Sequence, residues 1–339
     1  METGIGEGSV LGPLIFLVCI METSMVAEMV KEALTEEDKE AGEDLMITTC
    51  CFADDTTILL STANDMQMQK AMEICSKVYM TYFSTVGMKV NQTKEEHIVF
   101  YPRASERLLE EGVMVGGRKE ATSVKLLGVV VSQGWKFVNH VSKVISKASL
   151  KIAHVRKLRS YLKEEKVKMV AETLIMSVLK YGLEFCGRDY SNLVRLQKTY
   201  NVVLRLVTRS SRMTSVRLML AKTTSINIKL QYYYSRMSLM RRVMVSQSSP
   251  FTLTFVKYPS LTSRTCLYQS LMPNKLKYGE NSLVTVALNN LNSIGFGKRV
   301  QQQQGKRVQQ QQGILPGTQW LKTTALKFLR ENYDNGNLY

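Results

Sequence analysis

A run of apolar and β-branched residues, interrupted by two adjacent aspartates, is the feature that most restricts the fold of this chain. The run spans residues 45–60 and reads LMITTCCFADDTTILL, with Asp54 and Asp55 near its middle. Apolar and β-branched residues on both sides of a polar pair are typical of two strands joined by a tight turn. The sequence therefore predicts a β-hairpin with both carboxylates at its turn.

An apolar helix is predicted before this hairpin. It should begin near Leu11, because a proline such as Pro13 is tolerated only in the first turn of a helix. We expect it to run to about Leu34 and to belong to the core. The apolar stretch at residues 10–21 is only about 12 residues long, and a membrane-spanning helix needs about 20.

A second helix is predicted after the hairpin, with Asn64 or Asp65 as its N-cap and its end near Gly87. Its apolar residues recur at three- and four-residue steps: Met68, Met72, Cys75, Val78, Tyr79 and Tyr82. Short strands are predicted at residues 97–101, 113–115 and 125–131. Strands and helices mixed without regular alternation indicate an α+β fold.

The charge of the chain is divided unevenly along the sequence. The chain as a whole carries +16, but residues 1–100 hold six lysines, no arginine and 17 acidic residues, a net charge of −11. Residues 135–245 hold 23 basic and five acidic residues, a net charge of +18. The second region is suited to a polyanion such as a nucleic acid, although a basic surface that only keeps the protein soluble has the same composition.

The basic region is predicted to be helical throughout, with helices at residues 138–160, 163–181, 189–209 and 214–245. The third of these has a clean apolar stripe: Leu193, Leu196, Tyr200, Val203, Leu204 and Val207. Its basic residues lie mostly off that stripe: Arg195, Lys198, Arg205 and Arg209. We therefore divide the chain into a first domain at residues 1–133 and a helical basic domain at 134–246.

Residues 247–339 form a C-terminal extension that is predicted to be partly disordered. It contains a perfect tandem repeat of the octapeptide GKRVQQQQ at residues 297–312. Such a repeat has no packing logic and is too short to build a solenoid.

The six cysteines form no C-x-x-C pair, and only three histidines accompany them. This excludes a typical zinc site and does not indicate a disulfide framework. With no signal peptide and no transmembrane helix expected, the sequence predicts an intracellular protein of the nucleus or cytoplasm that does not bind membranes.

The two aspartates carry the clearest chemistry. Neighbouring side chains on a regular strand point to opposite faces, but at a tight turn two carboxylates can approach one cation. Mg²⁺ takes oxygen ligands, often one or two carboxylates together with substrate phosphates. Aspartate is also a favoured turn residue, so an isolated pair between strands is more often only a turn.

The order of four short motifs gives the pair a context. The segment GIGEGSVLGPLIF begins at Gly4, FADD at Phe52, GMKVNQTK at Gly87 and LLG at Leu126. In this order and spacing they resemble motifs B, C, D and E of the reverse transcriptases of non-LTR retrotransposons. The resemblance covers residues 4–210 and includes thumb-like helices in the basic region.

The resemblance implies a right-hand polymerase palm, here partial, built from the β-hairpin and a short antiparallel sheet with packed helices. An all-helical thumb should follow it. The implied activity is RNA-templated DNA synthesis by two-metal nucleotidyl transfer, with an RNA template, a DNA primer and dNTPs as partners.

The same resemblance implies roles for individual residues. Asp54 and Asp55 would bind Mg²⁺, and Lys94 would protonate the leaving pyrophosphate. The nucleotide- and template-binding residues would be Gly6, Gly8, Ser9, Phe52 and Ala53. Residues 126–129 would form the primer grip, which is a packing role.

Two departures from the family pattern bear on activity. The family has an earlier motif A that supplies the other principal aspartate, and this sequence begins three residues before motif B, without that motif or the fingers. Glu7 stands where the family has a neutral amide, and its charge would repel phosphates in a site that excludes solvent. We expect the isolated chain to have little or no polymerase activity.

Three alternatives remain at this stage. The chain could be a non-enzymatic nucleic-acid-binding remnant of a retrotransposon, which keeps the basic helices and discards catalysis. It could be an inert, decayed product with exposed apolar surface. A dinucleotide-binding fold would explain the glycine-rich segment, but no strand precedes that segment and its spacing is not G-x-G-x-x-G.

Overall fold

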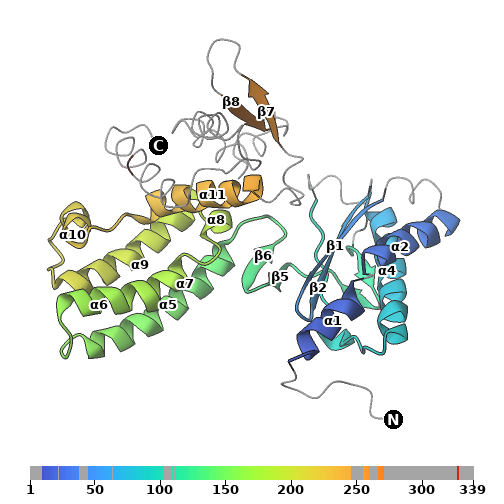
Figure 1. The fold of residues 1–339 in the computed structure, drawn as a ribbon, viewed down its shortest axis with the longest axis horizontal. Coiled ribbons are helices and arrows are strands. Elements are labelled where there is room, and N and C mark those ends of the chain that lie inside the picture. The colour runs from blue at the N-terminus through green and yellow to red at the C-terminus, as the bar shows by residue number, and fades with distance from the viewer. Residues whose placement is uncertain are drawn as a thin grey trace, which may run out of the picture. The chain divides into compact units, whose positions relative to one another are not determined.

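The computed structural model describes residues 10–21, 23–37, 45–62, 64–101, 109, 111–245, 255–259, 266–270 and 327. The described chain is α+β, with helices and small two-stranded sheets, as the sequence predicted (Figure 1). By its internal contacts it divides into two units. The first contains Met1–Leu126 and Val131–Trp135, and the second contains Leu127–Val130 and Lys136–Tyr339.

The predicted hairpin is confirmed. Strands β1 (Met46–Phe52) and β2 (Asp55–Ser61) pair antiparallel from Met46↔Ser61 to Phe52↔Asp55. The loop between them is therefore only two residues long, Ala53 and Asp54.

One face of this hairpin is covered by the helices α2 (Thr23–Glu37) and α4 (Asp65–Thr85) (Figure 1). Their shared core consists of Val26, Val30, Leu34, Leu45, Ala71, Ile74, Cys75 and Tyr79. Ile47 and Leu60 face each other in the register and pack partly against this core. The Tyr79 hydroxyl is also hydrogen-bonded to the Thr49 hydroxyl of β1. The hairpin is thus anchored through its inward-facing residues.

The second predicted helix is confirmed as α4. Its N-cap is Asn64, whose side-chain oxygen accepts a hydrogen bond from the Gln67 amide at 2.9 Å. The buried stripe is shifted from the predicted one: Ala71 and Ile74 are buried, while Met68 and Met72 are only half-buried.

The first predicted helix differs from the expectation in two ways. It is two helices, α1 (Gly12–Ile20) and α2, with a break after Ile20, where the Thr23 hydroxyl donates to the Ile20 carbonyl at 2.7 Å. Such a bond competes with the helical backbone ladder. The prediction that this apolar stretch belongs to the core was wrong for α1, which has no buried residue. Leu14 and Leu17 are both more than half exposed.

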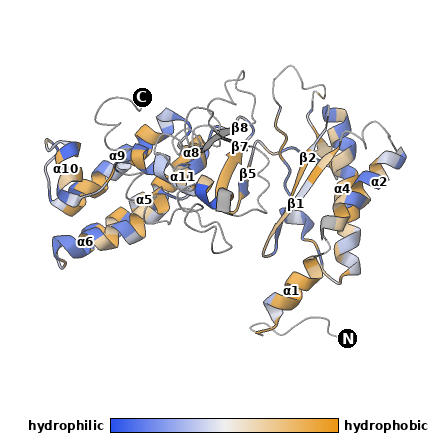
Figure 2. Cartoon of the chain, turned by 45° about the horizontal axis from the view of Figure 1, so that its top comes forward, coloured by the Kyte–Doolittle hydropathy of each residue, from blue (hydrophilic) through white to orange (hydrophobic). Residues whose placement is uncertain are grey.

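The stretch Gly12–Glu36 is the one place in the described residues that is long and apolar enough to cross a membrane. Figure 2 shows that α1 is mostly hydrophobic, whereas α2 also carries hydrophilic residues. The apolar stretch is longer than the sequence predicted, since it continues past Met21 into α2. The criterion concerns length and composition alone, and core helices of soluble proteins and signal sequences also meet it.

The rest of the first unit consists of short elements: η1 (Gln92–Lys94), β3 (Met114–Val115), β4 (Arg118–Lys119) and β5 (Ser123–Leu126). β3 and β4 form a small antiparallel hairpin, and β5 pairs with β6 (Val129–Ser132). The strand predicted at residues 97–101 is absent there, and the strand predicted at 125–131 is instead a hairpin that turns at Leu127 and Gly128.

The second unit is a helical bundle. Its long helices are α5 (Val138–Leu158), α9 (Tyr190–Thr208) and α11 (Ile228–Val245), joined by the shorter α6 (Glu164–Ala171), α7 (Ser177–Leu179), α8 (Leu183–Cys186) and α10 (Val216–Thr223). A π-helical segment, η3 (Glu172–Met176), lies between α6 and α7. All six residues of the predicted α9 stripe are buried. The helix predicted at residues 214–245 is broken, because Thr224 adopts a left-handed conformation with φ +51° and caps α10.

In the C-terminal extension the structure describes one antiparallel hairpin, β7 (Phe255–Pro259) with β8 (Cys266–Ser270). The octapeptide repeat at residues 297–312 lies outside the described residues.

Candidate functional site

The turn between β1 and β2 carries backbone strain. Two-residue hairpin loops need positive φ angles to match the twist of the strands. Ala53 supplies one, with φ +52°, although it has a Cβ and is not glycine. The left-handed region costs such a residue roughly 1–2 kcal/mol. Strain of this kind is a reason to look for function at the turn.

The turn lies beside the start of α1. Asp54 and Ala53 line an open cavity of about 480 Å³ together with Gly12, Pro13, Phe16 and Leu17. The cavity thus joins the aspartate turn to the first half of the helix that follows the glycine-rich segment. Apart from Asp54, its lining residues are apolar.

Both carboxylates are available to a ligand. Asp54 and Asp55 are exposed, and within the described part of the chain no hydrogen bond or ion pair engages either carboxylate. Two adjacent carboxylates match the oxygen preference of Mg²⁺, which commonly keeps water or phosphate as its remaining ligands. The described residues contain no group of three or more His, Cys, Asp or Glu side chains that could hold a metal ion. Among the described residues, Asp54 and Asp55 therefore lack a further His, Cys, Asp or Glu ligand close enough to complete a metal site.

The remaining predicted binding residues have different outcomes. Phe52 ends β1 and is 65% exposed, directly before the turn. Gly6, Gly8 and Ser9 lie outside the described residues.

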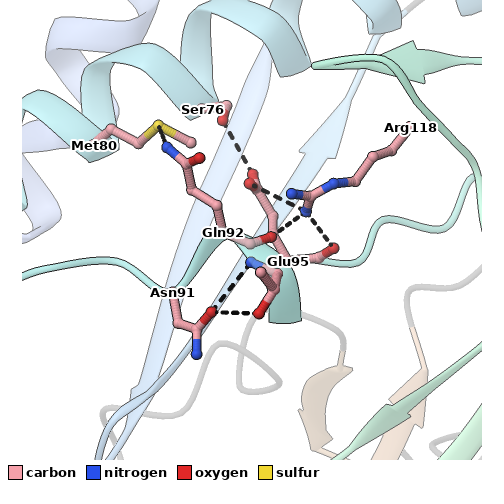
Figure 3. A network of polar contacts seen from close by, with 7 residues as sticks. Ser76, Met80, Asn91, Gln92, Glu95 and Arg118 are labelled. Atoms are coloured by element: carbon pink, nitrogen blue, oxygen red, sulfur yellow. Dashed lines mark hydrogen bonds and ion pairs between the residues drawn. The ribbon is translucent and has the colours of Figure 1, made fainter.

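Lys94 ends the η1 turn, and its side chain is exposed. The turn is capped by Asn91, whose side-chain oxygen accepts from the Thr93 amide at 3.1 Å and from the Thr93 hydroxyl at 2.7 Å (Figure 3). Lys94 does not line the cavity that contains Asp54. The structure does not bring these two predicted catalytic residues into one cavity.

A polar network that the sequence did not predict also holds the η1 turn. Arg118, on β4, donates to the carbonyl oxygens of Gln92 and Glu95, the latter at 3.1 Å (Figure 3). Its guanidinium lies 4.0 Å from the Glu95 carboxylate, which also accepts a hydrogen bond from Ser76 at 3.0 Å. These partners are 19 to 26 residues apart in sequence, so no local pattern could have identified them.

The helical unit presents a basic stripe on α5. Lys143, Lys147, Lys151 and His154 follow one another at three- and four-residue steps; Lys151 is half-buried and the others are exposed. α5 contains no acidic residue. In the described residues no ion pair neutralises these lysines, whereas Lys168 and Lys222 on neighbouring helices pair with Glu172 and Glu164.

The two buried cysteines, Cys75 and Cys186, are not suited to nucleophilic chemistry. The five whose side chains are described are free. Burial raises the pKa of Cys75 and of Cys186 to about 12, so these two are protonated thiols at neutral pH.

Comparisons with protein-family models, with curated proteins and with solved structures find no match to this chain.

Proposed function

We propose that the chain is a partial polymerase domain of the reverse-transcriptase type, with the hairpin turn at Asp54 and Asp55 as its metal-binding end. The observation that carries this proposal is the position of Asp54, at the tip of a two-residue turn and in a cavity with the start of α1. The motif resemblance gives the same two segments adjacent roles. The first unit then corresponds to part of a palm, and the helical unit to a thumb.

In this proposal Asp54 and Asp55 would hold Mg²⁺ through their carboxylate oxygens. The chemistry supplied by such ions is the stabilisation of charge as a 3′-hydroxyl displaces pyrophosphate. Phe16 and Leu17 would form an apolar wall of the cavity that Asp54 lines. Because the described residues bring no third ligand, we expect weak metal binding and little turnover by this chain alone.

Primer extension tests the catalytic part of the proposal. The chain is incubated with a DNA primer on an RNA template, dNTPs and Mg²⁺, alongside Asp54→Ala and the control Glu36→Gln, an exposed carboxylate on α2. We expect no extension above background from any of the three. Extension by the wild type that is lost only in Asp54→Ala would show that the site is complete, and extension kept in Asp54→Ala would remove Asp54 from it.

A second candidate function is nucleic-acid binding without catalysis, and the basic stripe on α5 favours it. Lysines at i and i+4 repel one another by a few tenths of a kcal/mol, so an unneutralised stripe weakens its own helix unless a polyanion covers it. Phosphates of a nucleic acid provide that charge.

Titration of single-stranded RNA at several salt concentrations tests this function. Replacing Lys143, Lys147 and Lys151 by Gln should weaken binding and reduce the slope of log K against log salt by about 2, since each single-strand phosphate contact contributes about 0.7. The control replaces Lys168 and Lys222, which glutamates already neutralise. Equal slopes for the two variants would remove α5 from the interface.

A further inference from the structure

The two-residue hairpin turn between β5 and β6 has an unusual composition, whereas the turn between β3 and β4 consists of the two glycines Gly116 and Gly117. Both of its central residues have positive φ, +46° at Leu127 and +84° at Gly128. This pair of angles is typical of a type I′ turn, which favours Asn-Gly or Gly-Gly. Leucine at the first position is disfavoured, because its Cβ crowds the following carbonyl. Other contacts must therefore hold this conformation.

Tyr181 supplies the first of these contacts. It follows α7, more than fifty residues away, and its hydroxyl donates a hydrogen bond to the Leu127 carbonyl oxygen. A Cβ built on Gly128 would lie 3.3 Å from both the ring and the hydroxyl of Tyr181. The ring therefore lies directly on the turn, while the side chain remains 51% exposed.

His140 supplies the second set of contacts that hold the turn. Its Nδ1 accepts a hydrogen bond from the Val130 amide at 3.3 Å. Nε2 must then carry the proton of the neutral ring, and it donates to the Tyr181 carbonyl at 3.2 Å. His140 itself is 2% exposed.

Gly182 makes this arrangement possible. It has φ +70°, and a Cβ there would meet His140 Nε2 at 3.0 Å and Val129 at 3.3 Å. The imidazole thus bridges the strand just after the turn and the backbone that carries Tyr181.

We infer that Tyr181 and His140 form a clamp that positions the Leu127–Gly128 turn. The tyrosine hydroxyl selects the left-handed conformation of Leu127, and the histidine fixes both the strand after the turn and the backbone of the tyrosine. All of these residues belong to the second unit, which includes Leu127–Val130. On this account the turn is held by the helical bundle and is not free to choose its own conformation.

The consequence for nucleic acid rests on the proposed function. If residues 126–129 contact a primer strand, a clamped turn presents one fixed surface to it, and an unclamped turn presents that surface only part of the time. The affinity for a primer–template duplex then falls with the fraction of molecules that keep the clamped conformation.

Hydrogen–deuterium exchange of the full chain tests the clamp. Tyr181→Phe keeps the ring and removes the hydroxyl, and Tyr181→Leu removes both contacts. We expect exchange in peptides covering residues 126–131 to be roughly fivefold faster in Tyr181→Phe, as for the loss of one neutral hydrogen bond, and faster still in Tyr181→Leu. Tyr161→Phe is the matched control, because Tyr161 is 85% exposed.

Peptides from α9 report on the fold in the same experiment. Unchanged exchange at residues 126–131 in both Tyr181 variants, with α9 still protected, would overturn the clamp. If either variant exposes α9, Gly128→Ala provides the second test, since its methyl group would press against the Tyr181 ring. Faster exchange at 126–131 supports the clamp, and wild-type exchange in this variant would also overturn it.

The affinity for a labelled DNA primer annealed to an RNA template is measured on the same proteins. A loss of roughly twofold or more in Tyr181→Phe extends the clamp to primer binding. Wild-type affinity together with faster exchange leaves the clamp standing and counts against the proposed function, so the two failures are distinguishable.

Discussion

Two hairpin turns of the described chain, β1–β2 and β5–β6, have the same length but differ in the contacts that support them, while the third two-residue turn, Gly116–Gly117 between β3 and β4, consists of glycine alone. Ala53–Asp54 and Leu127–Gly128 each join two strands through two residues, and each includes a non-glycine residue at positive φ. The first turn is exposed, and no described side chain bonds to its carboxylates. The second is held by a tyrosine and a buried histidine. The strained Ala53–Asp54 turn is therefore accessible to a ligand, whereas the strained Leu127–Gly128 turn is stabilised by contacts within the protein.

The largest expected change in the free energy of unfolding concerns the core that supports the Ala53–Asp54 turn. Its strands are anchored by the α2–α4 core, in which Leu34 is fully buried. Leu34→Ala should lower the free energy of unfolding by about 3 kcal/mol, because it leaves a cavity. Urea denaturation measures this loss.

The same variant sharpens the comparison between the turns. Exchange should rise in peptides covering residues 50–57 and stay at the wild-type level at 126–131, since a different cluster supports the second turn. A uniform rise in both segments would mean that one core supports both turns. If neither the wild type nor Leu34→Ala shows a cooperative unfolding transition in urea, the alternative that the chain is an inert, decayed product is favoured.

The second largest change in the free energy of unfolding is expected for Gly128→Ala. The new methyl group adds an unfavourable left-handed residue at φ +84° and crowds the Tyr181 ring. We expect a loss of about 2 kcal/mol in the free energy of unfolding. Gly116→Ala is the control, since it also has positive φ but nothing lies within 4 Å of its Cβ position. Equal losses in the two variants would show that the ring contributes nothing.

Ala53→Gly should raise the free energy of unfolding, by less than Gly128→Ala lowers it. Glycine removes the left-handed penalty of roughly 1–2 kcal/mol but loses part of it to the greater freedom of the unfolded chain, roughly 0.4–1 kcal/mol. A gain of about 0.5–1 kcal/mol in the free energy of unfolding remains. Chemical denaturation at neutral pH measures it, and a destabilised variant would show that the methyl group of Ala53 is packed and not strained.

The smallest expected effect is the pH dependence of the stability that His140 contributes beside the Leu127–Gly128 turn. Burial lowers the pKa of His140, and Lys147 and Lys143 on the same helix lower it further, although its bond to the Tyr181 carbonyl acts the other way. The unfolded chain therefore takes up a proton on His140 more readily than the folded chain. His140 contributes stability that is present above the ordinary histidine pKa of about 6.5 and is lost as the pH falls through its lower folded value.

The free energy of unfolding of the wild type should therefore decline below about pH 6.5. The decline should be shallower in His140→Gln, measured by denaturation at several pH values. Parallel curves for the two proteins would contradict a role for His140 in this pH dependence.

The sequence predicted those parts of the fold that depend on local patterns. The hairpin at residues 45–60, the Asn64 cap and the buried stripe of α9 follow from turn chemistry, capping and helical periodicity. The candidate site was predicted only as far as Asp54 and its turn. Its cavity with Pro13 depends on a contact across about forty residues, which no local rule supplies.

The missed features have a common physical cause. The exposure of α1, the hairpin inside residues 125–131 and the contacts of Arg118 and Tyr181 are all decided by distant partners. The break at Thr224 was missed because a threonine at positive φ gives no signal in the sequence. Glycine at that position would have been recognised as a helix end.

The proposed binding of a divalent cation by Asp54 and Asp55 is tested most directly by paramagnetic broadening with Mn²⁺. Backbone amide signals are recorded for the wild type, for Asp54→Asn with Asp55→Asn, and for the control Glu36→Gln. We expect broadening centred on residues 52–57 in the wild type and the control, and its loss in the double variant. Broadening that persists in the double variant, or that centres on the acidic residues of α2, would contradict it.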